Sequence, residues 1–252
     1  SSLSISYTLL SIYKAGSFHP GWSLSFTEII LYLFKEILKL NKKNINQIYR
    51  NYFVLSKGHC APALYSVGLQ IGLLKLNDLK KLRKINSITQ GHTDLRTIPW
   101  IGASTGSLGQ GLSFAVGIAL GMKKKKIDKH VYVMIGDGEL QEGQVWEALM
   151  FASHHRLGNL TVILDYNKLQ SDDYNKNIIN LEPIKEKIKS FNFIFSEING
   201  HNYDQIKNTF RKIKNLNNKP HFVISHTTKG KGVSFMENSK LWHGSVKISK
   251  EQ

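Results

Sequence analysis

Short apolar runs alternate along this chain with longer segments of helical periodicity. Residues 131–135 and 160–164 are almost wholly apolar, as is typical of parallel strands buried on both faces. Three further runs predict strands, at 52–55, 191–198 and 220–226, and helical periodicity marks the segments 4–14, 24–38, 61–72, 76–84, 112–122, 139–155, 184–189 and 203–213. The alternation predicts an α/β fold, a doubly wound parallel sheet with helices on both faces, built as one domain over residues 1–252.

Glycine, proline and polar residues mark the expected connections between these elements. His19-Pro20-Gly21 predicts a break between the first two helices, and residues 168–182 predict a polar linker. The Gly- and Lys-rich tail from Thr227 onward is expected to fold back over the functional site.

The most informative motif is Gly136-Asp137-Gly138, at the carboxyl end of a predicted strand. Asn167 follows the next predicted strand along the chain. Ligands of open α/β sheets bind at this edge, and carboxylate and amide oxygens are hard ligands for Mg²⁺. Glycine at 138 lets the backbone approach a phosphate closely. The order strand, Gly-Asp-Gly, helix, strand, Asn therefore favours a magnesium diphosphate site over an ordinary turn.

The composition is that of a globular protein, with 41% hydrophobic residues and no apolar stretch long enough to span a bilayer. The one cysteine, Cys60, excludes an intramolecular disulfide framework and fits a reducing compartment such as the cytoplasm. No signal peptide is recognisable, and a start at Ser1 rather than Met is compatible with a truncated or processed chain.

The formal net charge of +16 raises the question of nucleic-acid binding. The basic residues are 29 Lys and only 5 Arg, and the lysines are scattered. Surfaces that read bases and clamp phosphates use Arg as well as Lys. The charge is interpreted as a compositional bias toward Lys, Asn and Ile that leaves solvated faces, and a nucleic-acid partner is not expected.

Several motifs in order along the chain resemble transketolase. They are Gly16-Ser17-Phe18-His19-Pro20, Leu55-Ser56-Lys57-Gly58-His59, Ser104-Thr105-Gly106-Ser107-Leu108-Gly109-Gln110-Gly111, Gly136-Asp137-Gly138-Glu139-Leu140-Gln141-Glu142-Gly143, Asp165-Tyr166-Asn167-Lys168 and Trp242-His243-Gly244. The resemblance covers essentially the whole chain but only the N-terminal part of a full transketolase. A short chain of this kind resembles the N-terminal subunit of split, two-polypeptide transketolases.

This resemblance implies thiamine diphosphate held by Mg²⁺ (or Ca²⁺). The implied metal ligands are Asp137, Asn167 and the backbone carbonyl of Leu169, and Gly138 would offer its N–H to the diphosphate. Gly106, Ser107 and Leu108, at the start of a helix, would line the cofactor, as helix N-termini favour anions. Glu142 would lie at a subunit interface and couple two cofactor sites, although a carboxylate in the first turn of a helix is the simpler interpretation.

Four of the ten histidines lie beside Gly or Pro in loops, where site residues concentrate. The resemblance implies that His59 contacts cofactor and substrate, and that His19 and His243 reach substrate hydroxyls and shuttle protons. His92 would hold the first hydroxyls of the ketose. Imidazole suits such tasks because it exchanges protons near neutral pH. The other histidines are interpreted as structural or solvated.

Some positions depart from the family pattern. Phe18 and Trp22 flank the His-Pro-Gly segment where glycine is usual, so their rings are expected to narrow the substrate channel or to pack against a neighbour. Thr93 replaces a usual proline and is expected to loosen its loop. Cys60 replaces a small apolar residue and is expected to be a buried hydrophobe.

The resemblance also implies a missing part. The glutamate that activates the cofactor and the arginines that grip sugar phosphates belong to the pyrimidine-binding half, which this chain lacks. The implied partner is a C-terminal transketolase subunit, in a dimer of heterodimers that moves a two-carbon ketol unit from a ketose phosphate to an aldose phosphate. This chain is expected to be inactive alone. The alternatives are one component of another thiamine-dependent transferase, such as a deoxyxylulose-phosphate synthase, or a non-catalytic relic of the fold.

Overall fold

The computed structural model describes residues 1–16, 19–170, 173–213, 218–242 and 247–249. Its sheet has five strands, all parallel, in the order β1-β2-β3-β5-β4. The strands are β1 (Tyr52–Leu55), β2 (Val131–Gly136), β3 (Leu160–Tyr166), β4 (Ile194–Asn199) and β5 (His221–His226). Each overlaps a run that the apolar pattern predicted, so the expected parallel α/β fold is confirmed.

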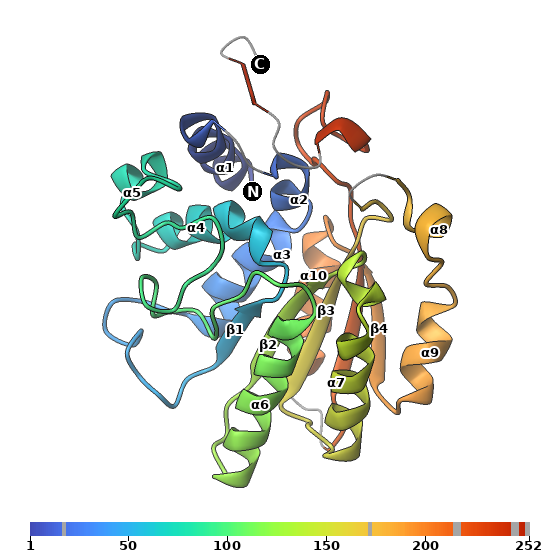
Figure 1. Cartoon of the computed structure of the whole chain (residues 1–252). Coiled ribbons are helices and arrows are strands. Elements are labelled where there is room, and N and C mark those ends of the chain that lie inside the picture. Colours follow the sequence, from blue (N-terminus) through green and yellow to red (C-terminus); the bar gives the residue numbers. More distant parts are fainter. Residues whose placement is uncertain (17–18, 171–172, 214–217, 243–246, 250–252) are drawn as a thin grey trace.

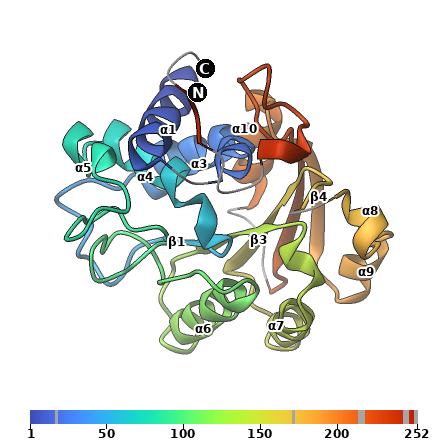
Figure 2. The same ribbon diagram turned by 45° about the horizontal axis from the view of Figure 1, so that its top comes forward.

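Helices cover both faces of the sheet (Figures 1 and 2). One face carries α6 (Gln110–Lys124), α7 (Gly143–His154) and α9 (Ile184–Ser190), and the other carries α3 (Thr27–Tyr32), α4 (Ala61–Gln70) and α10 (Tyr203–Ile213). Above the edge at which the strands end, α1 (Ser2–Ala15) and α2 (Pro20–Leu24) pack against α4 (Figure 1). The short α5 (Leu76–Lys80) and α8 (Asn175–Ile178) lie at the periphery. No helix among the described residues is long and apolar enough to cross a membrane.

The two cores explain why the strands are apolar at successive positions. In β2, Tyr132 contacts Phe210 of α10 and Met134 belongs to the same core, while Val133 and Ile135 join the core beneath α6 and α7. Alternate side chains of a strand point to opposite faces, so a sheet covered on both faces needs apolar residues at every position.

The predicted helices differ from the observed ones where local backbone geometry interrupts them. The predicted helix 24–38 is divided between α2, α3 and a π-helical turn, Leu33–Leu38, and α2 begins at Pro20 inside the predicted break. Proline suits the first turn of a helix because its missing N–H would have no intrahelical partner there. The predicted helix 76–84 ends at Lys80, before Arg83 adopts a left-handed φ of 60°. The linker 168–182 contains α8.

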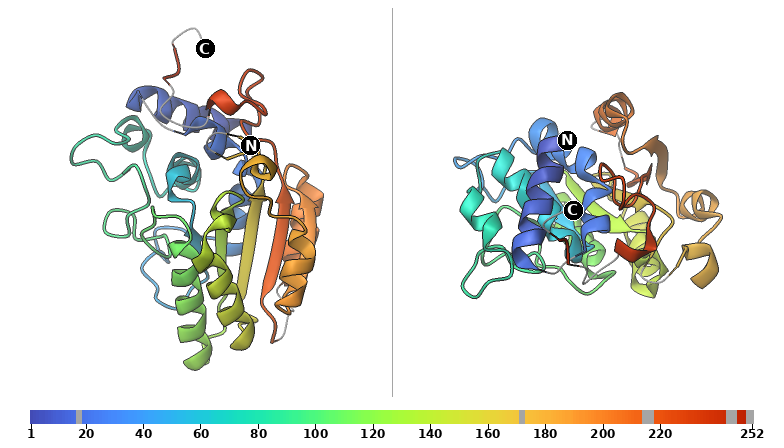
Figure 3. Two further views of the ribbon diagram at one scale, coloured as in Figure 1. Left: turned by 45° about the vertical axis from the view of Figure 1, so that its right-hand side comes forward. Right: turned by 90° about the horizontal axis from the view of Figure 1, so that it is seen from above.

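All five parallel strands end at one edge of the sheet, and the functional motifs follow these ends. The segment after β5 passes above this edge near α2, as both views of Figure 3 show in red. The backbone N–H of Gly230 donates to the carbonyl of Gly21 at 2.9 Å, which fixes the returning chain there. The expected return of the tail over this edge is confirmed for residues 227–242, which are referred to below as the C-terminal strap.

Candidate functional site

Asp137 lies one residue beyond β2, buried and with no side-chain cation bonded to it in the described part of the chain. Its Oδ1 accepts the N–H of Gly138 at 2.9 Å, and its Oδ2 accepts the N–H of Lys168 at 2.5 Å. Lys168 follows Asn167, so the structure brings together the two loops that the sequence placed at neighbouring strand ends. Burial, helped by the negative charge of Asp165, raises the pKa of the Asp137 carboxyl to about 7.

Asn167 and Leu169 form the other side of this junction. The Oδ1 of Asn167 accepts the N–H of Leu169 at 3.1 Å, and its buried Nδ2 has no hydrogen-bond partner among the described residues. No three His, Cys, Asp or Glu side chains within the described ranges could hold a metal together. The expected ligand set is of another kind, since Asp137 is its only carboxylate and its other members are amide and carbonyl oxygens.

A second buried carboxylate, Asp165, lies near the end of β3 and is fully satisfied. It pairs with the buried ammonium of Lys57, which follows β1. The hydroxyls of Ser25 and Thr227 each donate to it at 2.5 Å. Asp165 therefore ties together α2, the loop after β1 and the start of the C-terminal strap.

Glu139 is a third buried carboxylate at this edge, and it organises the glycine-rich loops. Its Oε1 accepts the hydroxyl of Ser56 and, at 2.7 Å, the N–H of Gly109. Its Oε2 accepts the N–H of Gly136 at 3.1 Å. One side chain thus joins the loop after β1, the end of β2 and the residue that precedes α6.

A cavity of about 390 Å³ opens beside these carboxylates. The rings of His19 and His59 meet edge to face with centroids 5.3 Å apart, and the ring of Trp22 meets His59 at 5.6 Å. The cavity is lined by His19, Trp22, His59, Leu108, Gly136, Gly138, Glu139, Gln141, Glu142, Gln170 and Ile178. Trp22 is buried, and its ring both lines the cavity and packs against His59, so the two alternatives expected for it stay open.

Lys229, which the sequence analysis did not single out, lies in the C-terminal strap. It is completely buried, and its Nζ has no hydrogen-bond partner among the residues that the structure describes. The ammonium lies 5.5 Å from the ring centroid of Trp22. Burial lowers its pKa to about 8, and the charge of Asp137 opposes that shift. A buried cation without a hydrogen-bonding partner is costly, so this group points to an anionic ligand.

The loop before α6 carries the other expected cofactor residues. A Cβ built on Gly106 would lie 3.4 Å from the ring of His92, so these two residues are brought together. Leu108 lines the cavity, and its carbonyl accepts the side-chain amide of Gln144 at 2.9 Å. Ser107 is exposed just before the helix.

Thr93, which is expected to loosen its loop, is hydrogen-bonded there to Thr105. Its hydroxyl lies 2.7 Å from that of Thr105, and the N–H of Thr105 donates to its carbonyl at 3.1 Å. The hydroxyl that replaces a proline ring thus fastens the loop to the segment before α6. Cys60 is buried, as expected, and burial raises the pKa of its thiol to about 12. His243 and Phe18 lie outside the described residues.

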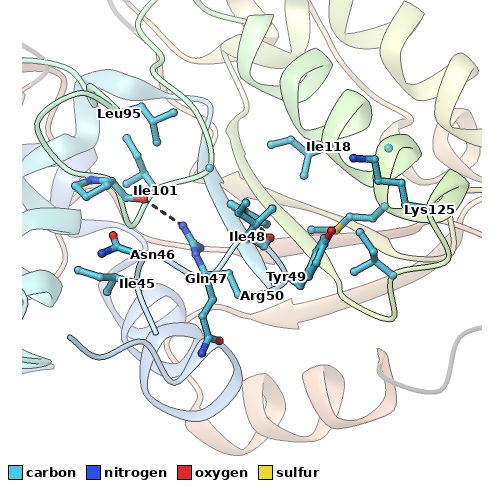
Figure 4. A pocket seen from close by; sticks show the side chains of 16 residues that line it. Ile45, Asn46, Gln47, Ile48, Tyr49, Arg50, Leu95, Ile101, Ile118 and Lys125 are labelled. Atoms are coloured by element: carbon cyan, nitrogen blue, oxygen red, sulfur yellow. Dashed lines mark hydrogen bonds between the residues drawn. The ribbon is translucent and has the colours of Figure 1, made fainter. Parts of the chain in front are cut away.

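A larger cavity, of about 540 Å³, lies at the β1 edge of the sheet, away from the strand ends that carry the motifs (Figure 4). Its walls are mostly apolar, and its buried Arg50 donates to the carbonyl of Pro99 at 3.2 Å. None of the described carboxylates and histidines lines it. The smaller cavity, which is lined by His19, His59 and Glu139, is therefore the better candidate for the functional site.

Comparison with known proteins agrees with this choice. Residues 6–251 match the family model described as "Transketolase, thiamine diphosphate binding domain". The chain belongs to the transketolase family. The family expected from the motifs is therefore confirmed.

Relatives described as separate subunits match over most of their own length. A 6-deoxy-6-sulfo-D-fructose transketolase subunit from Clostridium sp. (strain MSTE9) is 40% identical, over 97% of this chain and 88% of that protein. An apulose-4-phosphate transketolase subunit from Phocaeicola vulgatus is 38% identical, over 95% of this chain and 85% of its own. These matches agree with the N-terminal subunit of a two-polypeptide transketolase.

Single-chain transketolases match over only part of their length. The human enzyme is 37% identical over 91% of this chain, which corresponds to 36% of that protein. The crystal structure of the Campylobacter jejuni transketolase superposes with a TM-score of 0.90 at 34% identity, over 97% of this chain and 39% of the other. The chain thus corresponds to the diphosphate-binding part of the transketolase fold.

Proposed function

We propose that this chain is the diphosphate-binding half of a two-polypeptide transketolase and forms one domain over residues 1–252. The observation that carries the proposal is Asp137, a buried carboxylate to which no side-chain cation of the described residues is bonded, held against the Asn167 loop. A divalent cation at this point would neutralise the carboxylate and be held by Asp137, Asn167 and the carbonyl of Leu169. Mg²⁺ fits this oxygen set, as does Ca²⁺.

The unsatisfied donors around this point fit a diphosphate. The Nδ2 of Asn167 and the Nζ of Lys229 are buried without hydrogen-bond partners among the described residues. Charged donors bind phosphate oxygens more strongly than neutral ones. Lys229 would therefore add to the contacts expected from Gly138 and from the loop of Gly106, Ser107 and Leu108.

The cavity histidines would manage protons beside the bound cofactor. Thiamine diphosphate supplies the stabilisation of negative charge on carbon when it is bound. His59 and His19 line the same cavity in edge-to-face contact, so both can reach a substrate there. His92 lies beside Gly106, where it could hold substrate hydroxyls. His243 is included by family resemblance alone.

The active enzyme would need a second polypeptide. The proposed partner is a C-terminal transketolase subunit in a dimer of heterodimers, which supplies the cofactor-activating glutamate. Glu142 is exposed and also lines the cavity, as a residue at such an interface would. The relatives described as subunits support a partner of this kind. The cytoplasm remains the proposed location, since the one cysteine fits a reducing compartment.

The proposed reaction is transfer of a two-carbon ketol unit from a ketose phosphate to an aldose phosphate. Two of the relatives described as subunits carry names that refer to other ketoses, 6-deoxy-6-sulfo-D-fructose and apulose 4-phosphate. A ketose with an anionic group far from its carbonyl is therefore the proposed donor class.

The test is thiamine diphosphate binding by the Asp137→Asn variant of the full chain with its partner polypeptide. Calorimetric titration in Mg²⁺ is expected to show at least about a 100-fold loss of affinity, because a metal-binding carboxylate is lost. Asp128→Asn, an exposed carboxylate before β2, is the matched control and should bind as the parent does. Equal affinity of the Asp137 variant would refute the metal assignment.

A further inference from the structure

His201 forms a hydrogen-bonded bridge between two segments that are distant in sequence. It follows β4, in the turn that precedes α10. Its Nε2 accepts the backbone N–H of Thr228 at 2.9 Å, and its Nδ1 lies 3.2 Å from Oε2 of Glu28 on α3. Because Nε2 accepts a backbone N–H, it carries no proton in this arrangement. The proton of the neutral ring is therefore on Nδ1 and is donated to Glu28.

The residue that His201 holds comes immediately before Lys229. On the other side of Lys229, the N–H of Gly230 donates to the carbonyl of Gly21 at 2.9 Å. The backbone on both sides of the buried ammonium is thus fixed by hydrogen bonds to other parts of the fold. Because this backbone is fixed before a ligand arrives, less conformational entropy is lost when Lys229 binds the ligand, and the affinity is higher.

The turn that carries His201 is itself packed against the C-terminal strap. The backbone N–H of His201 donates to Oδ1 of Asn199 at 2.9 Å. A Cβ built on Gly200 would lie 2.6 Å from Cγ2 of Thr227, closer than side chains approach one another. Glycine at 200 therefore lets the turn approach the strap closely enough for the imidazole to reach Thr228.

We propose that His201 is a positioning residue that acts through Thr228 to place the Lys229 ammonium for a diphosphate. Glu28 fixes the orientation of the His201 ring, and the ring fixes the backbone of the C-terminal strap at Thr228. The strap in turn positions the ammonium of Lys229. Residues that ligate metals are commonly supported in this indirect way, and the same logic applies to a cation that binds a diphosphate. The inference rests on the proposed function, because it takes thiamine diphosphate as the ligand of Lys229.

The test is a double-mutant cycle on the chain assembled with its partner polypeptide. Thiamine diphosphate and inorganic pyrophosphate are each titrated in Mg²⁺ against the parent, His201→Ala, Lys229→Met and the double variant. We expect losses in affinity of about 3–10-fold for His201→Ala and about 10–100-fold for Lys229→Met. The double variant should bind as Lys229→Met does, because without the ammonium there is nothing left to position.

Two further variants separate positioning from general stability. His201→Gln keeps an acceptor for Thr228 and a donor for Glu28, so it should restore affinity to within about twofold of the parent. Glu28→Ala breaks the bridge from its other end and should give the same non-additive loss, which provides a test if His201→Ala does not fold.

The outcomes distinguish the inference from the proposed function. Parent-like binding by His201→Ala and Glu28→Ala, together with weak binding by Lys229→Met, would overturn the positioning role alone. Losses that multiply in the double variant would also overturn it. Parent-like binding by both Lys229→Met and Asp137→Asn would remove the proposed function and the inference with it.

Discussion

The ends of β2 and β3 present two buried aspartates with opposite surroundings. Asp165 is bonded to one ammonium and two hydroxyls, all from this chain. Within the described ranges, Asp137 is bonded only to two backbone N–H groups. The two buried lysines differ in the same way. Lys57 forms an ion pair with Asp165, whereas the Nζ of Lys229 has no hydrogen-bond partner among the described residues.

This contrast separates groups that hold the fold from groups that await a ligand. Buried charges are tolerated when they are paired and hydrogen-bonded, and they are costly otherwise. The Lys57–Asp165 pair is complete within the chain, whereas Asp137 and Lys229 each lack, in the part of the chain that the structure describes, a counterpart that a metal and a diphosphate would provide. Burial alone therefore does not identify a functional charge, but incomplete pairing does.

The largest effect is expected from breaking the completed pair. Lys57→Met should lower the free energy of unfolding by about 3–5 kcal/mol, because it leaves the Asp165 carboxylate buried without its cation. Chemical denaturation measures this loss. The double variant Lys57→Met/Asp165→Asn should recover part of it. A loss below about 1 kcal/mol for Lys57→Met would contradict the structural role.

Removing the unpaired cation of Lys229 should raise the free energy of unfolding. At pH 7 without cofactor, Lys229→Met should be more stable than the parent by about 1–2 kcal/mol, after allowance for solvent screening. The folded parent releases this proton near pH 8 and the unfolded chain near the ordinary value of 10.5. The parent therefore gains stability as the pH rises through that window, and the difference from the variant should shrink. Denaturation at pH 7 and pH 10 checks this; a variant less stable than the parent at pH 7 would disprove it.

A smaller effect is expected when only one hydroxyl of the completed cluster is lost. Ser25→Ala removes one of the donors to Asp165 and should lower the free energy of unfolding by about 1 kcal/mol. Ser23→Ala is the matched control, since the Ser23 hydroxyl donates to the carbonyl of His19, at 3.0 Å, within the same segment. Equal losses in the two variants would mean that the hydrogen bond from Ser25 to Asp165 stabilises the fold no more than the local hydrogen bond of Ser23 does.

The positions of the strands and their parallel arrangement could be predicted from the sequence, but not their order in the sheet, and the helices only in part. Continuous apolar runs identify strands covered on both faces, and β2 and β3 overlap theirs closely. The π-helical turn Leu33–Leu38 has no such signal in the sequence. α5 ends at Lys80, three residues before the left-handed Arg83, and no periodicity reveals either position.

The site was predictable where a strand end carries a distinctive residue. Asp137 and Asn167 follow apolar runs, so their proximity could be expected from parallel strands alone. Lys229 was missed because it is one of 29 lysines and only its burial distinguishes it. Position alone would not have singled it out, since Lys57, Lys168 and Lys229 all lie within three residues of a strand's carboxyl end and Lys168 is exposed.

The hydrogen bonds that Glu139 accepts from three loops bear on the free energy of cofactor binding. Three loops that would surround the pyrophosphate moiety are already cross-linked by one carboxylate before any ligand arrives. Ordering of these loops is therefore completed during folding and does not reduce the affinity later. This half of the enzyme should receive its cofactor as a rigid receptor, and any large rearrangement on binding would have to occur outside these three loops.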